Sequence, residues 1–170
     1  MSELQKSYAD FVLPPSVVSK VDVSRLVSEV ERLDGELTTM AVRASVGSQV
    51  AVQPVISRQL ADFLQANSLT ISQNSHERTE LLQQLRQLKD TIPVVHMTFA
   101  VTADGESLAR LAAWLRSEVH SQAVISVGLQ PALVAGVYLR TPNQVHDLSL
   151  RAKLKGSHAV LIKELEAARG

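Results

Sequence analysis

Residues 128–154 read GLQPALVAGVYLRTPNQVHDLSLRAKL, and this stretch decides the fold. Pro131 follows directly on a strand-like run, where it favours a turn. A strand is predicted over 134–140, because it is rich in β-branched, aromatic and other apolar residues. Residues 141–143, Thr-Pro-Asn, have the chemistry of a hairpin turn. A further strand is therefore predicted over 144–148, paired with the one before it.

The sequence on either side of this hairpin adds two helices and two strands. A helix is expected from about Ser149 to near the end of the chain. Upstream, Val95, Met97, Phe99 and Val101 alternate with other residues, which predicts a strand. After a turn in which Asp104 caps the next element, a helix follows, and then a strand over 123–129. The apolar face expected for that helix consists of Leu108, Leu111, Ala112, Leu115 and Val119. Residues 93–170 are therefore predicted to form an α+β domain with a four-stranded sheet and two helices.

Residues 1–92 have a different pattern, typical of a small helical bundle with three to four helices, one of them long. A short helix is expected over 3–12, ending before Pro14-Pro15. The long helix starts near Val23 with Asp22 as its cap. The next helix has Pro54 just before it and Asn67 just after it, with an apolar stripe of Ile56, Leu60, Phe63 and Leu64. The last one opens with a capping box of Asn74 and Glu77, ends at Pro93 and carries Leu81, Leu82, Leu85, Leu88 and Ile92.

The long helix carries a heptad seam, which we define as Val23, Leu26, Val30, Leu33, Leu37, Met40 and Ala44. Gly47 lies where this helix is expected to stop. The seam either packs inside the small bundle or receives a helix from another chain. The second reading would make the protein a cytoplasmic adaptor that binds a partner coiled coil.

Composition narrows the classes of function. The 170 residues include no cysteine, which excludes disulfides, thiol nucleophiles and cysteine metal sites. Lys plus Arg and Asp plus Glu balance at 17 each, so net charge gives no reason to bind nucleic acid or anionic lipid. No run reaches the roughly 18 apolar residues of a membrane span, and the first residues do not form a signal peptide. We expect a soluble protein without membrane insertion, most consistent with the cytoplasm.

No enzyme motif is present. The glycines are scattered rather than gathered in a phosphate-binding loop, and the five histidines lack zinc-site spacing. The nearest catalytic cluster is His146, Asp147 and Ser149, with His96 as a further candidate. Neighbours in a strand point to opposite faces, so His146 and Asp147 do not converge. Asp147 or Ser149 is better explained as the cap of the last helix, and no catalytic residue, cofactor or metal is predicted.

The run from Gly128 to Arg140 and its continuation from Val145 to Leu154 resemble the C-terminal signature of the delta subunit of bacterial F-type ATP synthases. The mitochondrial counterpart of that family is the oligomycin-sensitivity-conferring protein. The positions that carry the resemblance are Pro131, Ala135, Gly136, Asp147, Ser149, Arg151 and Leu154. Gly-Gly is usual in the family where this chain has Ala135-Gly136. The resemblance covers roughly 93–161, and the 92 residues before it are fewer than the family's six-helix N-terminal domain has.

The resemblance implies a non-catalytic connector in the peripheral stalk, or stator, of a proton-translocating ATP synthase. Its implied partners are the C-terminal helix of the b subunits and, for the N-terminal domain, the alpha subunits. The implied location is the cytoplasmic face of the cell membrane, as a peripheral part of the complex. Trp114 lies one step off the apolar stripe of its helix, so it is either partly buried at the edge of the core or a partner contact, since tryptophan is enriched in binding hot spots. Further interface candidates are Leu150, Arg151, Leu154 and Leu161, while Pro131, Gly136, Asp147 and Ser149 are expected to be structural.

Overall fold

A computed structural model of the chain describes residues 7–47, 54–133, 135–141, 144–148 and 150. Its contacts divide the chain into two compact units. The helical unit contains Met1–Pro93 and Ala109–Val124, and the sheet unit contains Val94–Leu108 and Ile125–Gly170. The segment Ala109–Val124 thus groups with the helices that precede it in the sequence. The division into domains 1–92 and 93–170 stays a prediction.

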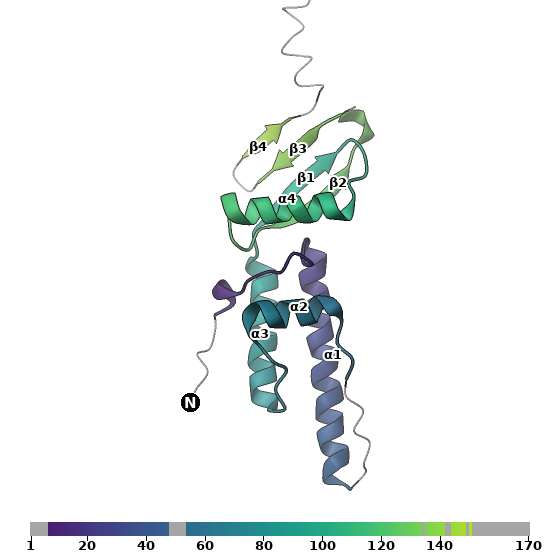
Figure 1. Ribbon diagram of the computed structural model, residues 1–170, viewed down its shortest axis with the longest axis vertical. Coiled ribbons are helices and arrows are strands. Elements are labelled where there is room, and N and C mark those ends of the chain that lie inside the picture. The colour runs from purple at the N-terminus through teal and green to yellow at the C-terminus, as the bar shows by residue number, and fades with distance from the viewer. Residues whose placement is uncertain (1–6, 48–53, 134, 142–143, 149, 151–170) are drawn as a thin grey trace, which may run out of the picture. The chain divides into compact units, whose positions relative to one another are not determined.

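The long helix α1 spans Lys20–Ser45 (Figure 1). Ser19 is its N-cap, and Asp22 is the third helical residue of a capping box: Ser19 accepts from the Asp22 N–H, and the Asp22 carboxylate accepts from the Ser19 N–H at 2.8 Å. The prediction that Asp22 itself caps the helix was therefore wrong by three residues. The carboxylate also accepts from the backbone N–H of Val18 and from the Ser19 hydroxyl, so it has three donors ahead of the helix.

The heptad seam on α1 packs inside the protein along most of its length. Val23, Leu26, Val30, Leu33 and Leu37 are all buried, and α1 packs against α2 and α3. Met40 is half-buried and Ala44 is exposed, so the last turns of the seam extend beyond this core. The chain's own helices therefore occupy most of the surface that an adaptor would offer to a partner coiled coil.

The helices α2 (Arg58–Asn67) and α3 (Ser75–Thr91) complete the bundle. Ser57 caps α2, so Ile56 lies outside this helix and is 40% exposed, contrary to the predicted stripe. Asn67, expected just after α2, is its last residue and is buried. Asn74 caps α3 as predicted, but Glu77 bonds to its side-chain amide instead of its backbone N–H, which donates to Ser72. In place of a helix over 3–12, the described part from residue 7 onward has a short 3-10 turn, η1 (Tyr8–Asp10), and then extended backbone.

The sheet has four strands, β1 (Val94–Phe99), β2 (Val124–Leu129), β3 (Val137–Arg140) and β4 (Val145–Asp147), in the order β2-β1-β3-β4. β3 is antiparallel to both β1 and β4. The Val124 N–H donates to the Pro93 carbonyl at the start of both strands, and the Gln130 N–H donates to the Phe99 carbonyl at their ends. The strands β1 and β2 are therefore parallel. The helix α4 (Gly105–Glu118) makes the crossover between them, as a parallel pair requires.

The four predicted strands are confirmed with small shifts at their ends. β3 begins at Val137 instead of 134, because a 3-10 turn, η2 (Pro131–Leu133), and Gly136 at φ +96° precede it. Asp104 accepts from the Ser107 N–H at 2.8 Å and caps α4 as expected. On α4, Ala112 and Leu115 are buried, whereas Val119 lies past the end of α4 and is 58% exposed, so its place on the apolar face was wrong. The helix predicted from Ser149 and the turn residues 142 and 143 lie outside the described residues.

Candidate partner-binding surface

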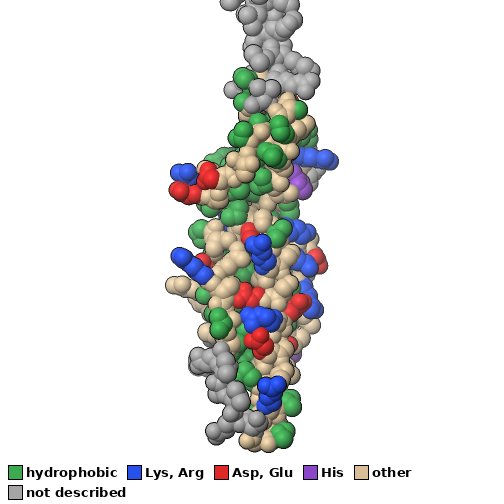
Figure 2. Space-filling model, turned by 90° about the vertical axis from the view of Figure 1, so that its right-hand side faces the viewer, with side chains coloured by type: hydrophobic (Ala, Val, Ile, Leu, Met, Phe, Trp, Pro, Cys, Tyr) green, Lys and Arg blue, Asp and Glu red, His purple; other side chains and the backbone are tan. Residues whose placement is uncertain are grey.

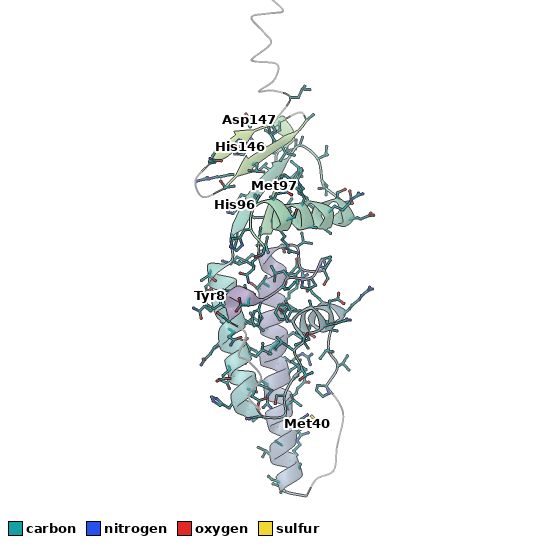
Figure 3. The ribbon with its side chains drawn as sticks, turned by 60° about the vertical axis from the view of Figure 1, so that its left-hand side comes forward. Tyr8, Met40, His96, Met97, His146 and Asp147 are labelled. Carbon is teal, nitrogen blue, oxygen red and sulfur yellow. The ribbon has the colours of Figure 1, made fainter. Side chains whose placement is uncertain are left out.

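His96 and His146, the two histidines considered as catalytic candidates, lie on opposite faces of the sheet. His96 pairs with Arg140 across β1 and β3. The next residue of β1, Met97, pairs with Leu139, and Leu139 pairs with His146 of β4. Residues paired in register share a face, so His96 lies on one face and His146 on the other. His96 is exposed, and the His146 Nε2 lies 3.2 Å from Gln144 (Figure 3). The two histidines therefore cannot act on one substrate atom, and they do not form one catalytic site.

Asp147 shares the face of His96, in the row of Thr98 and Tyr138. Figure 3 shows Asp147 next to His146 on β4, where the two residues alternate as strand neighbours do. Within the described ranges, no group of three or more His, Cys, Asp or Glu side chains could hold a metal ion. No described helix is long and apolar enough to cross a membrane.

The residues of the family pattern shape the backbone around β3. Pro131 opens η2, and Gly136 adopts a left-handed φ of +96° directly before the strand. The chain after β4 continues to pair along the same edge, because the Leu148 N–H donates to Val137 and the Leu150 N–H donates to Ala135. Leu150 is thereby fixed next to the Ala135-Gly136 pair. These contacts explain why the signature requires a small residue and a glycine there: the backbone bends and a second segment approaches it closely.

Within the sheet unit, exposed apolar side chains lie mainly along the two edges of the sheet. Val127 and Leu129 on β2 are 47% and 59% exposed, and Val145, Leu148 and Leu150 at the other edge are 53%, 58% and 41% exposed. A Cβ added at Gly128 would contact the Thr98 side chain, so Gly128 lies on the face of the sheet that carries Thr98. Strand register places Val145 on that same face. Val127 and Leu129 alternate with Gly128 and therefore lie on the opposite face. These five exposed apolar residues therefore lie along two separate edges of the sheet and do not make up one continuous flat patch.

Trp114 lies in the α4 part of the helical unit and is 54% exposed. Its helical neighbour Leu115 is buried, which places the indole on the outer side of α4. In Figure 2, charged side chains of both signs are spread over the helices, while hydrophobic side chains are more frequent over the sheet. Trp114 and Leu150 belong to different units, so each is a candidate contact by itself.

The remaining candidate residues are Ser149, Arg151, Leu154 and Leu161, and they lie outside the described residues.

The sequence pattern alone missed several polar side chains that the fold buries, namely Asn67, Arg78 and Gln122. Each appears in the sequence as an ordinary helix or turn residue, and each has at least one hydrogen-bond partner far away along the chain. No local signal could have identified them.

The chain thus combines a helical bundle with a small mixed α+β sheet whose edges expose apolar residues. The family model of the ATP synthase delta (OSCP) subunit matches residues 72–161. Because this match spans more than half of the 170 residues, the chain belongs to that family. No curated protein matches the sequence significantly.

The family match confirms the resemblance found in the sequence and extends it. It begins at residue 72, so it includes all of α3 as well as α4 and the sheet. The family is a non-catalytic, peripheral part of ATP synthase, and this chain shares that assignment at the family level. Residues 1–71, with α1 and α2, lie outside the match.

Proposed function

We propose that this protein is the peripheral-stalk connector of a proton-translocating ATP synthase. In this role it links the membrane-anchored b subunits to the catalytic head at the cytoplasmic face of the membrane. The family match over residues 72–161 is the observation that carries the proposal. A stator subunit has to resist torque, which calls for extended contacts and a rigid fold and needs no reactive group.

We propose that the b-subunit contact lies in the C-terminal part of the chain. The exposed edge residues Val145, Leu148 and Leu150 lead directly into the segment that contains Leu154 and Leu161. An amphipathic partner helix binds by placing its apolar side against such residues. Trp114, exposed on α4, is a second proposed contact.

We propose that the helical unit contacts the alpha subunits. Support comes from the family's order of domains, in which a helical domain precedes the sheet domain, and from α1 and α2, which lie ahead of the matched region. The described part of the helical unit has α1, α2, α3, most of α4 and the short turn η1, which makes it smaller than a six-helix bundle. The alternative, an adaptor that binds a coiled coil through the heptad seam, is disfavoured because Val23, Leu26 and Val30 are buried by the chain's own helices.

The b-subunit contact can be tested with a peptide of the C-terminal helix of that subunit. Leu154→Asp and Leu161→Asp should each weaken binding to the full-length protein by at least about tenfold, since a charge replaces an apolar contact. Lys155→Asp is the matched control for an added acid in the same segment. Trp114→Ala should also weaken binding, whereas Val119→Ala, at an equally exposed apolar residue, should not.

Circular dichroism separates lost binding from lost folding in these variants. A folded Leu154→Asp or Leu161→Asp protein that binds the peptide as well as wild type would contradict the proposed contact. The same result for Trp114→Ala would remove the tryptophan from the interface and leave the C-terminal contact in place.

A further inference from the structure

The chain ahead of α1 forms a strap, which we define as residues 8–17. It is anchored by apolar side chains: Phe11, Leu13 and Val17 are 3%, 5% and 0% exposed. The Phe11 ring packs edge-on against Phe63 of α2, with 5.5 Å between the ring centroids. Between these anchors the strap has irregular backbone and a turn at residues 15–16, in which the Val17 N–H donates to Pro14. Most of its carbonyl groups have no partner in regular secondary structure and need donors from elsewhere.

Arg116 of α4 supplies donors to three of these carbonyl groups. One terminal nitrogen lies 3.3 Å from the Leu13 oxygen and 3.2 Å from the Pro14 oxygen, and the other donates to Val17. The Nε donates to the carbonyl of Ala123 at 3.1 Å, which ties the strap to the turn after α4. The guanidinium is desolvated by burial, which lowers the pKa of Arg116. In the described part of the chain no carboxylate pairs with it, so backbone carbonyl groups are its main partners.

Gln122 does the same for the first part of the strap. It is 6% exposed, and its side-chain amide donates to the carbonyl groups of Tyr8, Ala9 and Phe11 at 2.8, 3.2 and 3.0 Å. Figure 3 shows Tyr8 in the short turn η1 at the start of the strap.

The bundle holds the strap from its own side. The Asn67 amide accepts from the Val12 N–H at 2.8 Å and donates to the Val12 carbonyl at 2.9 Å. Gln59 donates to the carbonyl of Ser16 at 2.7 Å. The strap is thus bound by side chains from α2 and, independently, from the segment 109–124.

We propose that the strap and the segment 109–124 form a reciprocal latch, in which each keeps the other folded. If the strap detached, the Arg116 guanidinium would lose three of its four carbonyl acceptors and the Gln122 amide would lose the three carbonyl groups it donates to, and each lost hydrogen bond reduces stability. Conversely, six carbonyl groups of the strap would each lose a donor if this segment unfolded. Because 109–124 connects β1 to β2, release of the first residues of the chain loosens the crossover that leads into the sheet.

This latch goes beyond the connector role, and it holds whichever partners the protein binds. It makes the N-terminal strap a control element for a segment about a hundred residues further along the chain. Coupling between two such sites is reciprocal by thermodynamic necessity. That reciprocity distinguishes a latch from two unrelated stabilising contacts.

Hydrogen exchange of the full-length protein, followed by mass spectrometry, tests the latch from both sides. Arg116→Met keeps the apolar stem and removes the donors. It should speed exchange of the Val12 and Val17 amides by at least about tenfold, the size expected for losing a charge-assisted hydrogen bond. Phe11→Ala loosens the strap at its opposite end and should speed exchange of the Ala123 and Val124 amides.

Arg43→Met and Gln83→Met are the matched controls, because both residues are exposed on α1 and α3. They should leave all four amides at the wild-type rate. Strand amides of β1 and β3 report on global unfolding and should keep their protection in every variant. If Arg116→Met does not fold, Arg116→Lys takes its place, since one ammonium group cannot reach all four carbonyl groups.

The latch would be overturned if the Arg116 variant speeds exchange in 109–124 and leaves Val12 and Val17 at the wild-type rate. It would also be overturned if Phe11→Ala affects the strap and α2 alone. Faster exchange on both sides, with the β1 and β3 amides unchanged, supports it.

Discussion

Arg78 shows how a single buried charge connects three parts of the helical unit. Its side chain is 3% exposed and donates to Asp34 on α1 at 2.6 Å, to Thr38 and to the carbonyl groups of Ser72 and Gln73. Replacing Arg78 removes all four contacts at once and leaves the partly buried Asp34 carboxylate without this ion pair. The Arg78 network therefore fixes α3, α1 and the α2–α3 loop against one another.

Arg78→Met should lower the free energy of unfolding by about 2–4 kcal/mol, measured by urea denaturation with circular dichroism. Arg86→Met is the control: Arg86 also joins α3 to α1, through Glu31 at 2.6 Å, but the two side chains are 56% and 41% exposed. An exposed pair contributes about 0–1 kcal/mol. Equal losses in the two variants would contradict the account of the Arg78 network.

Asp22 makes the start of α1 sensitive to acid. Burial by itself raises its pKa, but hydrogen bonds from Ser19, Val18 and Gln59 outweigh this, so the pKa is lowered from its ordinary value of 3.8. A carboxyl with a lowered pKa stabilises the fold above that ordinary value, and the contribution is lost as the pH falls through the folded-state pKa. The sensitive range therefore lies below about pH 4.

The stability of wild type and of Asp22→Asn should differ most near neutral pH and converge as the pH falls below about 4. Urea midpoints at a series of pH values measure this difference. Asp90→Asn, at an exposed residue of α3, controls for the general effect of losing a carboxylate. A difference that stays constant down to about pH 3 would show that the Asp22 charge does not stabilise the start of α1.

At the scale of elements, the sequence predicted most of the helices and strands and the caps of α3 and α4, but not the caps of α1 and α2 or the bend before β3. Alternation and 3.6-residue periodicity are local signals, so α1, α3, α4 and the four strands were correctly expected. Where α1 and α2 begin depends on hydrogen bonds of Ser19 and Ser57, and these were missed. The late start of β3 depends on the backbone of Gly136, which a residue pattern does not display.

Gly136→Ala should destabilise the protein by about 1–2 kcal/mol, because alanine is strained at φ +96°. Gly35→Ala is an informative counterpart: Gly35 lies inside α1, and no atom lies within 4 Å of the added Cβ. That substitution should stabilise by up to about 1 kcal/mol, since alanine is the better helix former. Thermal unfolding measures both, and a neutral Gly136→Ala would contradict the bend proposed before β3.

At the scale of the whole molecule, the family signature was readable and the long-range polar contacts were not. Pro131 and Gly136 stand at fixed spacings that the sequence displays directly. Arg78 and Asp34 are 44 residues apart, and Arg116 and Val17 are 99 residues apart, so neither pair leaves a periodic trace. The enzyme candidates His96 and His146 could be judged only once strand register placed them on opposite faces.

We propose that this protein connects the stalk to the head of an ATP synthase. Affinity purification of the tagged full-length chain, from mildly solubilised membranes of the cells that produce it, tests this role. We expect the b subunit and the alpha subunits of the catalytic head to be recovered together with it. Recovery of the tagged chain without either subunit, under conditions that keep the ATP synthase assembled, would contradict it.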